Sequence, residues 1–247
     1  VCQLEIMGQT ISMAQASLIE PYYDQGDFNG FATYYYPLQT RFGNIETTIT
    51  AIWKAAYNAI ANDNLLLENL ETQDAGLFEP GAKEVLLGEA LALRAYLHFD
   101  ILRIFQPPYA TEEGKTQKRI PYKEAYGMDF TPSASSDTIL NRILVDLKRA
   151  ETMMKDNDPI GKTYRATYLS GDRKLKMNYY AVRALQARVY LWRGDYQEAY
   201  DAAMEVIGAA DDMGVRFLTM DDLSTKDSQN DYVNRSCPME YIFGLQV

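Results

Sequence analysis

Apolar residues recur at helical spacing along most of the chain between residues 45 and 209. A first stripe predicts a helix over residues 45–72. A second stripe predicts a helix over residues 80–105, which ends before Pro107 and Pro108 because proline cannot continue a helix. Residues 73–79 join the two, so the segment 45–105 is expected to form a helical hairpin.

Three further helices are expected in the second half of the chain. Ser135, Ser136 and Asp137 offer N-cap oxygens to a helix over residues 137–156. Residues 177–193 and 195–209 read as two helices separated by Gly194, which suits a left-handed C-cap. Between and after these helices the periodicity is lost, which predicts a long loop over residues 106–136 and a loop-rich tail over residues 210–247. The apolar run from Tyr241 to Leu245 in that tail is expected to be a strand or an extended segment.

The last helical pair carries the most specific local pattern. Small and aromatic residues fall at the spacings of a tetratricopeptide unit, in which small residues let two antiparallel helices approach closely. They are Ala187, Tyr190, Gly194, Tyr196, Ala199 and Ala203. The positions that usually hold tryptophan and leucine are occupied by Arg183 and Gln186, so the match is partial. The fold class is therefore predicted to be mainly α, one domain over residues 1–247 built from stacked antiparallel helical hairpins with long loops.

Composition narrows the classes of function. Hydrophobic residues at 47% and charged residues at 23% are typical of a folded protein. A net charge of -10 disfavours nucleic acid and anionic lipid, which bind mainly through Lys and Arg. The 19 tyrosines outnumber 9 phenylalanines and 2 tryptophans, and tyrosine suits a surface that holds a sugar ring because it has a flat apolar face and a polar tip. For any single tyrosine, however, packing between helices is the better explanation.

Signals for catalysis or metal binding are weak. His98 stands alone without metal-ligand spacing, and most such histidines simply pack or hydrogen-bond. Gly161, Lys162 and Thr163 imitate the end of a phosphate-binding loop, but Asp156 occupies the position of its first glycine. Cys2 and Cys237 form neither a CxxC pair nor a disulfide framework, and Cys2 is better explained as a small apolar residue than as a lipid anchor.

Carboxylates are abundant, and a helical glycosidase would need only two of them on either side of one sugar bond. Most are expected on exposed helix faces, where solvation explains them better: Glu68, Glu71, Glu151 and Glu205. We therefore expect no catalytic residue, no metal site and no cofactor.

Four motifs, in order, resemble those of the SusD/RagB family over residues 45–210. The first is carried by Trp53, Tyr57, Ile60, Asn62, Asn64 and Leu66. The second is carried by Gly88, Glu89, Ala90, Leu93, Arg94, Ala95, Tyr96, Phe99 and Leu102. The third comprises Thr138, Ile143, Asp146, Leu147 and Ala150, and the fourth is the tetratricopeptide-like pair from Ala181 to Ile207. Each can also be explained by packing alone, with Arg94 and Glu89 expected to be buried and to tie helix to helix.

The resemblance implies a non-catalytic lipoprotein at the outer-membrane surface of a Bacteroidetes-type bacterium. Such a protein binds oligosaccharide, passes it to a SusC-like TonB-dependent transporter and touches the membrane only through a lipid anchor, which is not evident in this chain. Members are usually much longer, so the chain corresponds to their N-terminal, tetratricopeptide-like portion.

A cluster of aromatic, amide and charged residues before the first long helix is the predicted glycan site, because stacking faces and planar hydrogen-bonding groups suit sugars. Its residues are Tyr22, Asp24, Asn29, Tyr34, Tyr35, Tyr36, Arg41 and Asn44. A tetratricopeptide-type protein-interaction scaffold without sugar binding is the alternative, and such a scaffold has no need of this cluster.

Overall fold

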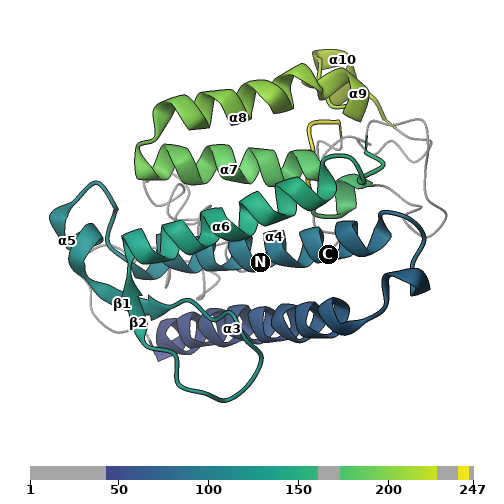
Figure 1. Cartoon of the computed structure of the whole chain (residues 1–247). Helices are drawn as coiled ribbons and strands as arrows, with labels where there is room; N and C mark the ends of the chain where they lie inside the picture. The colour runs from purple at the N-terminus through teal and green to yellow at the C-terminus, as the bar shows by residue number, and fades with distance from the viewer. Residues whose placement is uncertain (1–42, 161–172, 227–238, 245–247) are drawn as a thin grey trace. The chain divides into compact units, whose positions relative to one another are not determined.

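The computed structural model describes residues 43–160, 173–226 and 239–244. In these residues the protein is mainly α-helical, as the sequence predicted, and it also has one two-stranded sheet, which was not predicted (Figure 1). Helix α3 (Gly43–Thr72) crosses the boundary between two compact units, which falls between Asn62 and Asp63. In the first unit, Trp53 and Tyr57 lie one turn apart on α3, and their ring centroids are 4.8 Å apart.

The second unit is a stack of helices in which each packs on the next. α4 (Ala82–Phe105) packs against α6 (Ser136–Met154), α6 against α7 (Tyr179–Arg193), and α7 against α8 (Tyr196–Gly208). Successive helices run in opposite directions (Figure 1), so the predicted antiparallel arrangement is confirmed for these four. The five long helices begin and end within two residues of the predicted bounds.

Close packing of α4 on α6 depends on a small residue. A Cβ atom on Gly88 would lie 2.4 Å from Cγ of Met154, whose side chain is completely buried. α4 is buried around most of its circumference, since it contacts α6, α7 and the sheet. Its sequence accordingly lacks a polar stripe.

Ser135 and Gly194 cap helix ends as predicted, and Asn178 is a further cap that was not predicted. The side chain of Ser135 accepts a hydrogen bond from the Thr138 amide at the start of α6. Asn178 accepts one from the Ala181 amide at the start of α7, with a distance of 2.9 Å. Gly194 ends α7 with φ of 93°, a left-handed conformation that strains residues with a Cβ atom.

Short elements within the predicted loops were not foreseen. Residues 106–136 contain α5 (Glu112–Thr116) and the antiparallel strands β1 (Lys118–Pro121) and β2 (Ser133–Ser135). The tail contains α9 (Ala210–Met213) and α10 (Met220–Ser224), and short 3-10 turns lie at Ala75–Leu77 and Arg173–Leu175. Residues 241–244 form no strand. No helix of the described ranges is long and apolar enough to cross a membrane.

Candidate functional site

The predicted glycan cluster is placed only at its last residue. Asn44 lies in the first turn of α3, while the other seven residues, from Tyr22 to Arg41, lie outside the described residues. The cluster therefore remains a prediction. Cys2, Cys237 and the segment 161–163 also lie outside these residues.

A buried polar network centred on Arg94 lies between helices of the second unit. The Arg94 side chain, on α4, donates from Nε and Nη2 to the two carboxylate oxygens of Asp146 on α6, at 2.8 and 2.7 Å. Its Nη1 donates to Oδ1 of Asn64 at 2.9 Å and to the carbonyl of Glu124 at 3.0 Å. Arg94 is only 5% exposed, and the bidentate pair with Asp146 neutralises its charge and satisfies hydrogen-bond donors of its guanidinium.

The same network anchors the segment that follows β1. The side-chain Nδ2 of Asn64 donates to the backbone carbonyls of Lys123 and Ala125, at 3.2 and 3.3 Å. The hydroxyl of Tyr122 donates to Asp146 at 2.6 Å. Asn64 and Asp146 are 0% and 3% exposed, so these bonds form where water does not compete.

His98 adds another anchor from α4. Its Nδ1 lies 2.9 Å from the carbonyl of Arg94, and the Lys123 amide donates to its Nε2 at 3.0 Å. This pattern requires a neutral ring that carries its proton on Nδ1. Burial lowers the pKa of His98 to about 3, and the ring stacks on Tyr122 with centroids 3.9 Å apart. The prediction that His98 packs and hydrogen-bonds is confirmed, and no cluster of possible metal ligands occurs in the part of the chain described.

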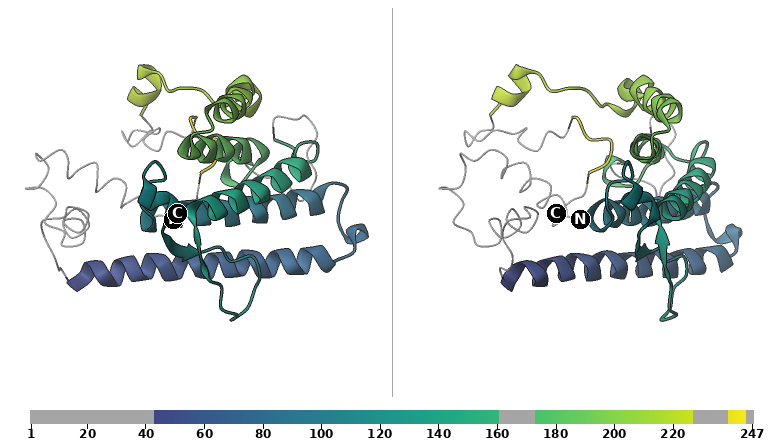
Figure 2. Two further views of the ribbon diagram at one scale, coloured as in Figure 1. Left: turned by 60° about the vertical axis from the view of Figure 1, so that its left-hand side comes forward. Right: turned by 90° about the vertical axis from the view of Figure 1, so that its left-hand side faces the viewer.

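Beyond this anchor, the loop between the strands carries exposed apolar side chains. We call residues 122–132 the β1–β2 loop; it extends away from α4 and α6 in both views of Figure 2. Tyr126, Met128 and Phe130 are 51%, 103% and 90% exposed. The Tyr126 amide donates to Glu68 of α3 at 2.9 Å, and Nζ of Lys123 donates to the Asp129 carbonyl at 2.6 Å. The loop thus joins a fixed base to an apolar tip.

Carboxylates that were expected on exposed faces mostly lie there. Glu68, Glu71 and Glu205 are exposed. Glu151 is the exception, because its position on α6 faces α7. Its side chain is 16% exposed and pairs with Arg183 at 3.3 Å, and Gln186 donates to it at 2.9 Å. Burial opposes its ionisation, but these partners outweigh burial and lower its pKa.

The motif residues Arg94 and Glu89 are both engaged as predicted. Glu89 pairs with Arg173 at 2.5 Å, and Arg173 also holds the buried Asp158 at 2.9 Å. The sequence did not predict the Arg94 network as a whole, because its members stand far apart in the sequence, at positions 64, 94, 122 and 146. The exposed loop tip was missed because its sequence shows no period.

The stack of antiparallel helices, with a loop held in place by side chains of those helices, is typical of a helical-repeat protein. A family model for SusD-like proteins, described as starch-binding and associating with the outer membrane, matches residues 9–191, and the chain belongs to this family. Members of the family bind carbohydrate. No curated protein matched the sequence significantly.

Several solved structures share the fold. A putative sugar binding protein from Bacteroides vulgatus is 25% identical with a TM-score of 0.60, over 81% of this chain and 42% of its own. A SusD superfamily protein from Bacteroides thetaiotaomicron is 24% identical with a TM-score of 0.56, over 72% and 36%. A laminarin binding SusD-like protein is 20% identical with a TM-score of 0.55, over 79% and 37%. The chain therefore spans less than half the length of each.

Proposed function

We propose that this chain is part of a glycan-binding nutrient-uptake protein at the outer-membrane surface, which passes oligosaccharide to a SusC-like TonB-dependent transporter and does not cleave it. The observation that carries the proposal is membership of a family described as starch-binding and associating with the outer membrane. The putative sugar binding and laminarin binding relatives support glucans as the first ligands to test.

The proposed primary contact is the cluster from Tyr22 to Asn44. The apolar stripes of α4 and α6 are used to bury one another, as Val85, Leu91 and Leu147 illustrate, with exposures of 0%, 1% and 0%. Sugar recognition needs an exposed aromatic plane for the apolar side of the ring, surrounded by groups that replace the water on its hydroxyls. The cluster supplies both kinds of group.

A scaffold for protein partners is the second candidate, and one feature favours it. The outer side of α8 exposes apolar residues at helical spacing: Tyr196, Tyr200, Met204 and Ile207 are 71%, 60%, 45% and 63% exposed. A row of exposed apolar side chains on one helix face is typical of a surface that binds a protein partner. A scaffold of this kind would bind no sugar.

Calorimetric titration of the full chain with maltoheptaose and laminarihexaose separates the two candidates. If the chain binds glycans, at least one of these oligosaccharides should give saturable heat. Single replacement of Tyr34, Tyr35 or Tyr36 by Ala should then weaken this binding at one or more of the three positions without lowering the melting temperature. Tyr200→Ala, on α8, is the matched control and should leave binding unchanged. Absence of binding to any glycan of a broad plant and host panel would contradict the proposal and favour the scaffold.

A further inference from the structure

We propose that the tip of the β1–β2 loop is a second carbohydrate contact on this chain, in which Tyr126 and Phe130 stack on the rings of a glucan and Met128 lies against its apolar edge. This inference rests on the proposed function and adds to it a site within the described residues. It does not depend on the cluster from Tyr22 to Asn44.

Anchoring of the loop base is the first argument. Every residue from 123 to 126 has a backbone group bonded to a side chain of α3 or α4, through Asn64, Glu68, Arg94 or His98. A loop held this way loses little conformational freedom when a ligand binds. Weak ligands such as sugars benefit most, because little of their contact energy is then offset by ordering the protein.

Exposure of the tip is the second argument. Met128 and Phe130 are almost completely exposed to water and Tyr126 is half exposed, although the helices of the protein have an apolar core in which other large side chains are buried. None of these three side chains takes part in the anchoring network, whose one bond to Tyr126 uses its backbone amide. Their apolar surface therefore adds nothing to the anchor of the loop, and a ligand would gain by covering it.

Charged groups of the loop and of α6 identify the class of ligand. Glu124 and Arg142 form an ion pair at 3.0 Å in which the side chains are 52% and 43% exposed, and the carboxylate of Asp129 is exposed within the loop. A bilayer or an apolar protein surface that covered the tip would strip water from these charges, which is costly. Sugar hydroxyls instead replace that water with hydrogen bonds to carboxylate and guanidinium. Exposed aromatic planes in a loop that also carries such groups favour a carbohydrate.

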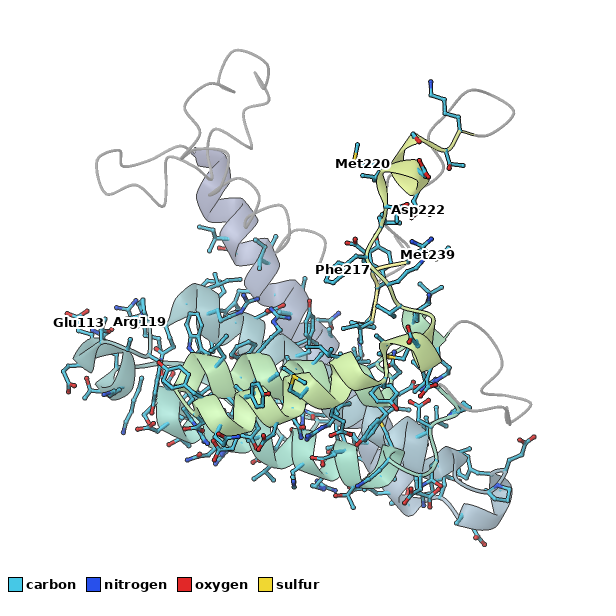
Figure 3. All side chains as sticks on the ribbon, turned by 90° about the horizontal axis from the view of Figure 1, so that it is seen from above. Glu113, Arg119, Phe217, Met220, Asp222 and Met239 are labelled. Carbon is cyan, nitrogen blue, oxygen red and sulfur yellow. The ribbon has the colours of Figure 1, made fainter. Side chains whose placement is uncertain are left out.

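The experiment uses the full chain with maltoheptaose and laminarihexaose as probes, and methionine methyl groups labelled with ¹³C. The signal of Met128, assigned with Met128→Leu, is expected to shift on titration with the glucan that binds. The signal of Met220, which is 79% exposed and belongs to α10 (Figure 3), is expected to stay in place. Met220→Leu assigns that control.

Affinity provides the second readout. Tyr126→Ala combined with Phe130→Ala should weaken glucan binding by about three- to tenfold, the loss of an aromatic contact of ordinary strength. Phe217→Ala, an equally exposed phenylalanine on another segment (Figure 3), should leave affinity unchanged. Unchanged melting temperature and methyl spectra of the core would show that each variant folds.

The outcomes separate the two proposals. If wild type binds neither these glucans nor any other glycan, the proposed function fails and this site fails with it. If wild type binds but the double variant binds equally well and Met128 does not shift, only the loop site is overturned. Sedimentation of wild type as a dimer that Phe130→Ala dissociates, without an effect on glucan binding, would also overturn it, because the tip would then serve self-association.

Discussion

Arg94 shows what a single residue contributes to this molecule. It was predicted to be buried and paired because it sits in a family motif on an otherwise apolar helix face, and this is confirmed. The identity of its partners could not be predicted, since Asp146 and Asn64 lie 52 and 30 positions away in sequence. The pairing depends on how α4 meets α6 and α3, which is a tertiary property.

Replacement of Asp146 by Asn tests how much this pairing stabilises the fold. The guanidinium of Arg94 would keep its place but lose its counter-charge, which costs about 3 kcal/mol or more for a buried pair. Urea unfolding should show this decrease in the free energy of unfolding. Glu71→Gln, which removes the exposed pair with Arg149 at 3.3 Å, is the control and should cost about 0–1 kcal/mol. Equal effects in the two variants would contradict a special role for the network.

His98 should make stability depend on pH. Its pKa is about 6.5 in the unfolded chain and about 3 in the folded protein, because burial disfavours the charged ring. Between these values the unfolded state binds the extra proton, so the contribution of His98 to stability is present above pH 6.5 and decreases as pH falls toward 3. The limiting slope is about 1.4 kcal/mol per pH unit.

Asp63 acts in the opposite direction, so the test needs a variant. Burial raises the pKa of Asp63 from 3.8 to about 6, with Arg94 opposing the rise, and this makes the folded state gain relative stability as pH falls through 6. The pH dependence of wild type is thus a sum of terms with different signs. Subtraction of the urea stability of His98→Asn from that of wild type, from pH 7 to pH 4, should leave a difference that shrinks as pH falls. A constant difference would show that His98 is not buried in its neutral form.

At the scale of elements, the long helices were predictable and the short ones were not. Apolar periodicity and caps locate α3, α4, α6, α7 and α8 because each contains several turns of consistent pattern. The strands β1 and β2 are held mainly by contacts distant in sequence. Gln106, for example, donates to the Gln117 carbonyl at 3.0 Å and to the Ser136 hydroxyl at 3.1 Å, and it accepts from the Arg119 amide. Sequence periodicity over four residues cannot reveal such a strand.

The glycine that joins α7 to α8 offers a matched pair of substitutions. Gly194→Ala should lower the free energy of unfolding by about 1–2 kcal/mol, because Ala is strained at φ of 93° although open space surrounds the site. Gly208→Ala, in the last turn of α8 and equally open, should be neutral or raise stability by up to about 1 kcal/mol, since Ala favours helix. Thermal unfolding measures both. Destabilisation of the same size at both positions would contradict the assigned C-cap.

At the scale of the whole molecule, the fold and the family could be predicted from the sequence, but only part of the candidate site could be. Composition pointed to the cluster from Tyr22 to Asn44, which stays a prediction. The β1–β2 loop showed tyrosines and charges without a pattern, and its exposed tip becomes apparent only once Asn64 and Arg94 are seen to hold its base. The chain covers 36–42% of the length of the three similar structures described above, so further parts of such proteins can contribute to binding.

The molecule is expected to bind glucans without cleaving them. Cleavage needs two carboxyl groups on either side of the sugar bond, of which one is protonated near neutral pH. Among the carboxyl groups of the described residues, Asp63 comes nearest to such an acid because burial raises its pKa to about 6, yet Arg94 already lies close enough to favour its charged form. Incubation of the full chain with maltoheptaose and laminarihexaose, followed by chromatography of the products, should show only background hydrolysis. Turnover that Asp63→Asn abolishes while glucan binding persists would place the protein among the glycosidases, with Asp63 as its general acid.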